Sequence, residues 1–193
     1  MAYLTNDAID ALGLRACGRG VKISEFARIY NPAAVSIGDN VRIDDFCILS
    51  AGTGGIALGS HIHFAAYSSI IGKGAVSIAN YCNISSRVSI YSSSDDYSGE
   101  FLTSPVIHEA FTNVNHSPVR IAEHCIVGCG SVILPGTCMG KGVAIGALSL
   151  VKGQLKDFTL YGGVPLVAIK DRRQDFLMLE ASHRDFFESQ IEI

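Results

Sequence analysis

The chain has 193 residues, of which 48% are apolar and 17% charged, and its formal net charge is −3. This length suits one domain with a sizeable core, and the apolar fraction excludes a disordered chain. Basic residues form no stripe and no apolar stretch is long enough to span a bilayer, so neither nucleic acid nor membrane insertion is expected. An acidic N-terminus predicts no secretion signal, and six cysteines without paired spacing indicate reduced thiols in a cytoplasmic protein.

The first segment, residues 1–20, is predicted to cap the fold. Within it, TNDAIDALG (5–13) has the pattern of a short helix, with Asn6 as the N-cap and Gly13 as the stop. Such a helix would cover the open end of the structure that follows.

The second segment, residues 21–169, carries an aliphatic residue at every sixth position. These residues form one run of six and three runs of three: Ile121, Val127, Ile133, Met139, Ile145 and Val151; Ile37, Ile43 and Leu49; Leu58, Phe64 and Ile70; Ile78, Ile84 and Ile90. Apart from Ile90 and Val151, where the excursion begins and the repeat decays, the residue four positions later is small or β-branched and uncharged: Val41, Cys47, Thr53, Ile62, Ser68, Gly74, Cys82, Val88, Cys125, Ser131, Thr137, Val143 and Ser149. A short strand plus a tight corner gives six residues per side, and three sides give one coil of a triangular parallel β-helix with both sets pointing inward.

Three features interrupt or end this repeat. Surplus residues at GTGG (52–55) and GKGA (72–75) predict widened corners. A long excursion, residues 92–118, leaves after Ile90, and loops of that length in compact repeat proteins are usually functional. The last segment, 170–193, is predicted to form a helix packed on the prism or on a partner subunit, because apolar and aromatic residues recur in it at helical spacing: Phe176, Leu179, His183, Phe186 and Phe187.

The period of six with one excursion resembles the hexapeptide-repeat family of left-handed parallel β-helix acyltransferases. Residues 118–151 look like the closing coils of that family, and YGGVPLVAIK (161–170) resembles its terminal motif. The short N-terminus favours the branch that acetylates nucleotide-linked amino sugars, such as dTDP-4-amino-4,6-dideoxyglucose, or a related polysaccharide O-acetyltransferase, over the galactoside and maltose O-acetyltransferases. The resemblance implies a left-handed coil, a homotrimer, and transfer of acetyl from acetyl-CoA to a sugar or nucleotide-linked amino sugar in surface polysaccharide (O-antigen) biosynthesis.

Acyl transfer from a thioester needs a group that takes a proton from the attacking hydroxyl or amine. His63 is the favoured base, because its neighbours Ile62 and Phe64 face inward and turn it outward. It then lies in a polar column between Arg42 and Asn83, which become candidates for substrate binding.

Other groups remain candidates for the same role. His116 lies where the excursion returns. In the galactoside and maltose branch, the base is a histidine just after the coil that opens the excursion, and Asp95 holds that place here. Asp95 is therefore a base, an orienting group for a histidine such as His63 across a trimer interface, or a ligand for a substrate amine. Its neighbour Asp96 is a candidate for substrate binding, although both aspartates also suit an Asx turn, and an amine nucleophile could attack without a side-chain base. His124 is expected to face water.

Two tight corners and two lysines are candidates for holding coenzyme A. Gly128 with Cys129, and Ala147 one coil later, would let the pantetheine arm approach backbone amides. Lys152 and Lys170 could meet the phosphates, although either could simply be an exposed lysine. Lys170 stands where the family carries a basic residue after Gly-x-Pro.

The sequence leaves two alternatives to an acetyltransferase. One is a catalytically silent β-helix that serves as a binding or assembly subunit, against which the Ser-rich excursion and the intact terminal motif argue. The other is a metal enzyme resembling the γ-type carbonic anhydrases. That class needs three metal-binding histidines, two of them five residues apart, and no pair here has that spacing, so no metal is expected.

Overall fold

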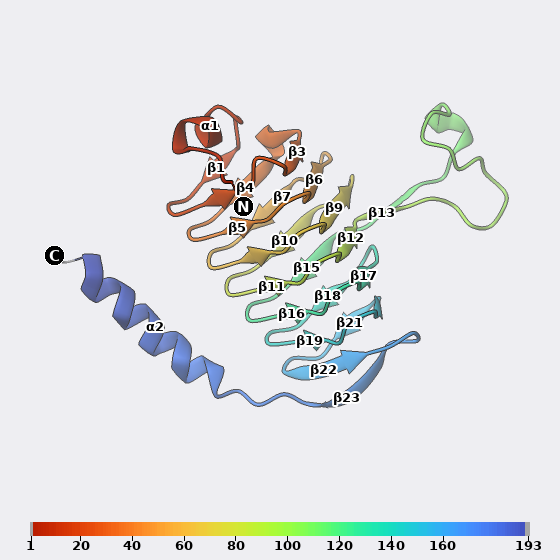
Figure 1. Ribbon diagram of the computed structural model, residues 1–193. Coiled ribbons are helices and arrows are strands. Elements are labelled where there is room, and N and C mark those ends of the chain that lie inside the picture. Colours follow the sequence, from red (N-terminus) through yellow and green to blue (C-terminus); the bar gives the residue numbers. More distant parts are fainter. Residues whose placement is uncertain (1, 192–193) are drawn as a thin grey trace.

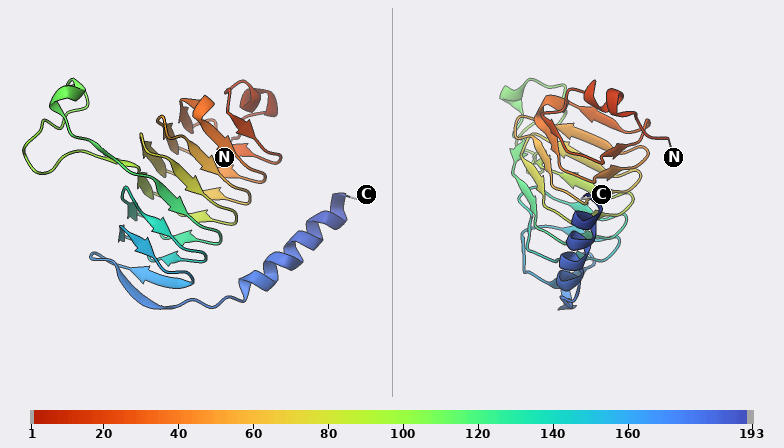
Figure 2. Two further views of the ribbon diagram at one scale, coloured as in Figure 1. Left: turned by 180° about the vertical axis from the view of Figure 1, so that it is seen from behind. Right: turned by 90° about the vertical axis from the view of Figure 1, so that its left-hand side faces the viewer.

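The computed structural model describes residues 2–191, without the side chains of residues 184, 185 and 187–191. The chain winds into a triangular prism whose three faces are parallel sheets, visited in turn by each coil (Figure 1). One excursion projects from the prism, and a helix at the C-terminus runs back along it (Figure 2).

The strands of each sheet are short and stack in register. The first sheet holds β1 (Ala16–Cys17), β4 (Val35–Ile37), β7 (Ile56–Leu58), β10 (Val76–Ile78), β15 (Val119–Ile121), β18 (Cys138–Met139) and β21 (Gln154–Leu155). The second sheet holds β2 (Lys22–Ile23), β5 (Arg42–Ile43), β8 (His63–Phe64), β11 (Asn83–Ile84), β16 (Ile126–Val127), β19 (Ala144–Ile145), β22 (Thr159–Gly162) and β23 (Val167–Asp171), of which only β23 runs antiparallel to its neighbour. The third sheet holds β3 (Arg28–Tyr30), β6 (Ile48–Ala51), β9 (Ser69–Gly72), β12 (Ser89–Tyr91), β17 (Val132–Ile133) and β20 (Leu150–Val151).

The six-residue period sets the core as predicted. Every one of the fifteen aliphatic positions is at most 4% exposed, and residues of the same column pair across coils, as Ile90 and Ile133 do. The second inward column is also confirmed, except at Thr53 and Gly74, which are not buried. These two lie in the widened corners, where the surplus residues shift the register so that Ile56 and Val76 point inward instead.

The three inward cysteines behave as small core residues. Cys47, Cys82 and Cys125 are each at most 2% exposed, and each thiol lies 3.2 Å from a carbonyl oxygen of the next coil. Burial raises the pKa of the Cys47 thiol to about 11, so this thiol stays neutral in the core. All six cysteines are unpaired.

The excursion begins and ends as a short antiparallel hairpin of β13 (Ser93–Ser94) and β14 (Asn115–His116). Its far end carries the 3₁₀ helix η2 (Glu109–Phe111), well away from the prism (Figures 1 and 2). The widened corner at 72–75 supports its base, where a Cβ on Gly74 would lie only 2.8 Å from the carbonyl oxygen of Ser92. The excursion therefore rests on a corner that only glycine allows.

Helices lie at both ends of the chain, and η1 (Pro32–Ala34) precedes β4. Helix α1 (Asn6–Asp10) packs Ile9 against the core. The predicted N-cap, Asn6, is wrong, because Asn6 is already helical and the extended Thr5 accepts the N–H of Ala8 at 3.3 Å. Helix α2 covers Phe176–Ile191, and no helix among the described residues is long and apolar enough to cross a membrane.

The segment boundaries at 20/21 and 169/170 stay predictions. Strand β1 lies within residues 1–20 and pairs with β4, and β23 spans the second boundary.

Candidate functional site

One polar cluster lies on the outer face of the second sheet. In the strand register, His63 of β8 lies beside Arg42 of β5 on one side and Asn83 of β11 on the other, in the column that the six-residue period predicts. The side chain of His63 is 35% exposed, and its inward neighbours Ile62 and Phe64 are buried. Asn83 Oδ1 is buried and has no hydrogen-bond partner among the described residues.

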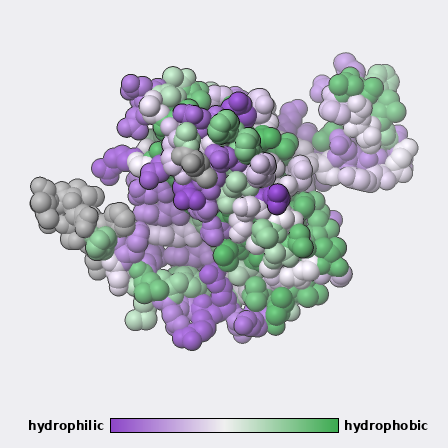
Figure 3. Space-filling model, viewed as in Figure 1, coloured by the Kyte–Doolittle hydropathy of each residue, from purple (hydrophilic) through white to green (hydrophobic). Residues whose placement is uncertain are grey.

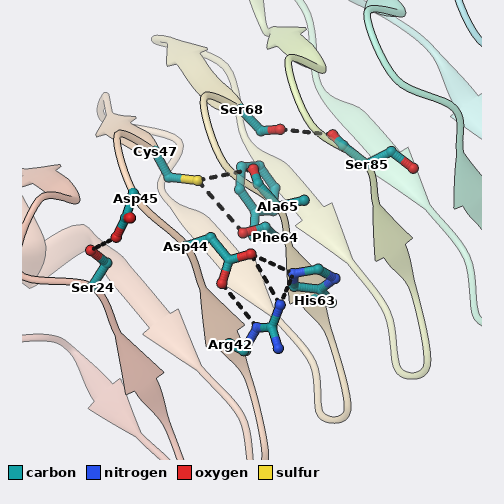
Figure 4. A network of polar contacts seen from close by, with 10 residues as sticks. All are labelled: Ser24, Arg42, Asp44, Asp45, Cys47, His63, Phe64, Ala65, Ser68 and Ser85. Carbon is teal, nitrogen blue, oxygen red and sulfur yellow. Dashed lines mark hydrogen bonds and ion pairs between the residues drawn. The ribbon is translucent and has the colours of Figure 1, made fainter. Parts of the chain in front are cut away.

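Sequence reasoning missed the centre of this cluster, Asp44. Its carboxylate accepts a hydrogen bond from His63 Nε2 at 2.8 Å and two from the Arg42 guanidinium at 2.9 and 3.1 Å (Figure 4). Burial raises the pKa of the Asp44 carboxyl, but the hydrogen bonds from His63 and Arg42 lower it more, so its pKa lies below its ordinary value. The only sequence signal was a charged residue directly after inward Ile43, where later coils have Ala65 or Gly128.

This contact decides which nitrogen of His63 is available. Nε2 lies 2.8 Å from Asp44 Oδ2 and 2.9 Å from Arg42 Nη2, and only the carboxylate can accept its hydrogen. Neutral His63 therefore carries its proton on Nε2, and Nδ1 is the nitrogen left to act as a base.

A second cluster lies on the excursion. Asp95 and His116 line one pocket of about 660 Å³, together with Lys73, His108 and Glu109. The pocket brings together two of the three predicted catalytic residues, whereas His63 is not among its lining residues. His116 Nδ1 lies 2.7 Å from the hydroxyl of Ser93, a contact that sequence reasoning also missed.

Asp96 is engaged within its own loop. Its Oδ2 accepts hydrogen bonds from Ser98 Oγ at 2.6 Å, from Ser98 N at 3.0 Å and from Gly99 N at 3.3 Å. The hydrogen bond from the Ser98 hydroxyl is the main cause that lowers the pKa of this carboxyl. Asp96 thus forms the Asx turn that the sequence left open, and a substrate role for it stays a prediction.

Three of the predicted coenzyme A residues lie together. Gly128 and Cys129 turn the corner between β16 and β17, and Ala147 turns the same corner one coil later. A Cβ on Gly128 would stand 2.5 Å from Ala147 N, which shows how closely the two corners stack. Lys152 and Lys170 are exposed, on the segment after β20 and on β23.

The expectation that His124 faces water is wrong. His124 is 9% exposed, because α2 covers it and Glu180 Oε2 lies 2.8 Å from its Nε2. The rings of His61, Tyr81 and His124 stack at 4.7 and 5.1 Å along one corner, and Phe176 of α2 packs on His124. This contact confirms that the C-terminal helix packs on the prism.

Comparisons with known proteins agree with this architecture. The chain is 49% identical, over 94% of both chains, to a dTDP-4-amino-4,6-dideoxy-D-glucose acyltransferase of Escherichia coli. It is 30% identical, over 83% of this chain and 84% of the relative, to the E. coli K12 protein WbbJ, whose name assigns it to lipopolysaccharide O-acetyl transfer. No family profile matches the chain.

A solved structure extends the comparison to the fold. A variant of AntD, an N-acyltransferase from Bacillus cereus bound to dTDP and coenzyme A, superposes with a TM-score of 0.91 at 39% identity, covering 98% of this chain and all of that chain. The prism is the left-handed β-helix that the resemblance implied. No group of three or more metal-ligating side chains is found among the described residues. From the identity, the coverage and the shared fold together, this chain is an acyltransferase and belongs to the hexapeptide-repeat acyltransferase family.

Proposed function

We propose that the protein transfers the acetyl group of acetyl-CoA to the 4-amino group of dTDP-4-amino-4,6-dideoxyglucose. The observation that carries this proposal is the 49% identity over 94% of both chains to the E. coli acyltransferase named for that sugar. A structure of AntD with this dTDP-sugar and coenzyme A, 41% identical over 97% of this chain, supports both ligand classes. The product would serve surface polysaccharide synthesis in the cytoplasm, where the six unpaired thiols would stay reduced.

The reaction requires one proton acceptor. The amine nitrogen bonds to the thioester carbonyl carbon, the C–S bond breaks, coenzyme A leaves as its thiolate, and the nitrogen gives up a proton. Asp95 is our candidate acceptor, because it lines the excursion pocket and carries an acceptor-only carboxylate. AntD structures include substitutions of one aspartate and of a serine ten residues before it, the spacing that separates Ser85 from Asp95 here.

His63 lies on a different element from that pocket, and its role depends on assembly. We expect a homotrimer in which His63 of one chain approaches the excursion of a neighbour. Exposed aromatic rings support such a contact, because Phe26, Phe46 and Tyr67 stack in a row. The excursion, which projects at the upper right of Figure 3 with apolar residues on its surface, exposes Val106 and Phe111 at 88% and 62%. Exposed apolar surface of this kind is typical of protein interfaces. Sedimentation showing a stable, active monomer would remove this part of the proposal.

Coenzyme A would lie along the corners at Gly128, Cys129 and Ala147, where backbone amides are open to the pantetheine arm. Lys152 and Lys170 would meet its phosphates. A double Lys152→Ala, Lys170→Ala variant should therefore raise the KM for acetyl-CoA more than the KM for the sugar.

The decisive assay measures thiol release from acetyl-CoA with dTDP-4-amino-4,6-dideoxyglucose, and checks the acetylated product by mass. dTDP-glucose, which offers only hydroxyls, is the matched control acceptor. Turnover of the amino sugar alone is expected, whereas turnover of dTDP-glucose alone would favour O-acetyl transfer, as the WbbJ name suggests. If acetyl-CoA binds but no thiol is released with either acceptor, the result would support a catalytically silent subunit.

The same assay separates the candidate bases. We expect Asp95→Asn to lower kcat by about 10²–10⁴-fold and leave the KM for acetyl-CoA nearly unchanged. Glu100→Gln is the matched control, because Glu100 is an exposed carboxylate of the same excursion that does not line the pocket. A loss confined to His63→Ala would assign the base to the second sheet instead.

A further inference from the structure

The widened corner at residues 72–75 reaches the excursion pocket through a chain of hydrogen bonds. The backbone N–H of Lys73 donates to Ser93 Oγ at 2.7 Å, and Ser93 Oγ lies 2.7 Å from His116 Nδ1. Ser93 and His116 face each other as partners in the β13–β14 hairpin. His116 and Lys73 both line the pocket that contains Asp95.

One assignment of these bonds uses the hydrogen of the Ser93 hydroxyl as well as a lone pair of its oxygen. A hydroxyl has one hydrogen to donate and two lone pairs to accept. One lone pair of Ser93 Oγ already accepts the Lys73 N–H, and among the described residues His116 Nδ1 is the acceptor placed for its hydrogen. In this assignment, neutral His116 accepts at Nδ1 and carries its own hydrogen on Nε2, on the opposite edge of the ring.

We propose that Ser93 is a positioning residue that holds neutral His116 with Nε2–H as a hydrogen-bond donor to the substrate. This inference rests on the proposed function and deepens it. The oxygen that receives the bond is the thioester carbonyl oxygen, which becomes negative when the amine adds. The corners at Gly128 and Ala147 lie between the second and third sheets, whereas the excursion leaves between the third and the first, so this thioester would belong to coenzyme A held by a neighbouring chain of the proposed trimer. No proton is transferred from His116, so the amine proton still passes to Asp95 and the C–S bond breaks as before.

The arrangement explains three sequence features together. The surplus residues at 72–75 place the Lys73 N–H beneath the excursion, the serine run before Asp95 supplies the hydroxyl that accepts it, and His116 returns as the hairpin partner of Ser93. It also gives the two pocket residues different roles, because the Asp95 carboxylate can only accept a hydrogen bond, whereas the His116 imidazole would donate one.

The first test is independent of turnover. Nitrogen-15 NMR of labelled histidine, at a pH where His116 is neutral, reports which ring nitrogen carries hydrogen, and the His116→Gln variant assigns the signal. We expect an unprotonated Nδ1 in the wild type and in Ser93→Thr, and a mixture of tautomers in Ser93→Ala. A proton on Nδ1 in the wild type, or an unchanged tautomer in Ser93→Ala, would overturn the inference.

The second test separates a donor from a base. Glutamine keeps an N–H donor near the position of Nε2 but cannot take a proton at neutral pH. We therefore expect His116→Ala to lower kcat by about 10²–10³-fold and His116→Gln to recover most of that loss. Ser93→Ala should lower kcat, and Ser93→Thr should restore it. Ser94→Ala is the matched control, because within the described part of the chain the Ser94 hydroxyl donates only to the backbone carbonyl of Asp95.

Equal loss in His116→Gln and His116→Ala would refute the donor role. A wild-type protein that acetylates no dTDP-amino sugar would refute the proposed function, and the donor role with it. The NMR result would still decide the Ser93–His116 arrangement separately, so the two failures can be distinguished.

Discussion

Two glycines at the same corner of successive coils should respond differently to the same substitution. A Cβ on Gly128 would lie 2.5 Å from Ala147 N and 2.7 Å from Gly146 C, both backbone atoms that cannot move without shifting the coil. A Cβ on Gly146 would find Tyr161 O at 3.5 Å, an ordinary contact. Overpacking of this kind costs about 1–3 kcal/mol, whereas alanine in a compatible backbone stabilises by about 0.4–1 kcal/mol through the unfolded chain.

The measurement is urea unfolding of Gly128→Ala and Gly146→Ala at matched protein concentration, supported by thermal melting. For a chain of this size each kcal/mol shifts the Tm by about 2–4 °C, so the two variants should move in opposite directions. Neither glycine has a left-handed φ, so backbone strain does not confuse the comparison. If Gly128→Ala is as stable as Gly146→Ala, the coils do not approach at this corner as described.

Two further perturbations test other parts of the structure. Ile133 is 0% exposed and lies between Ile90 and Val151. Ile133→Asp should therefore lower the free energy of unfolding in urea by several kcal/mol, and Ile133→Val by only about 0.5–1.5 kcal/mol. An aspartate variant that melts like the wild type would disprove the register. Because the folded-state pKa of Asp44 is lowered, its contribution to stability is present above the ordinary carboxyl value of about 3.9 and disappears as pH falls below it. The stability difference between wild type and Asp44→Asn should therefore shrink on acidification through that range, and a difference that stays constant would contradict the ion-pair geometry.

The core could be predicted from sequence because its cause is local and repetitive. A residue such as Ile133 points inward for the same reason as the residues six positions away, so each position confirms the next. Thr53 does not point inward because the extra residues of its corner shift the six-residue register without changing the residue types. The glycines marked the widened corners, but not which later residue would resume the inward column.

The polar contacts were harder to predict because they join different coils. Asp44 and His63 are 19 residues apart, and Ser93 and His116 are 23 apart. Such pairs can be found only once the length of each coil, including its widened corners, is known. The prediction for His124 was wrong for a related reason, because Glu180, on the helix that covers His124, comes 56 residues later in the chain.

The location of the excursion follows from the same geometry. A regular prism presents flat faces and stacked corners, which offer little concave surface for a substrate. The excursion, where the repeat is interrupted, builds a pocket, and the hairpin of β13 and β14 places Asp95 and His116 beside it. The Arg42–Asp44–His63 cluster remains on a regular face, held by its own ion pair. For His63 to reach a substrate in the pocket, the two surfaces must therefore come from neighbouring chains, which ties its catalytic role to the oligomeric state that sedimentation measures.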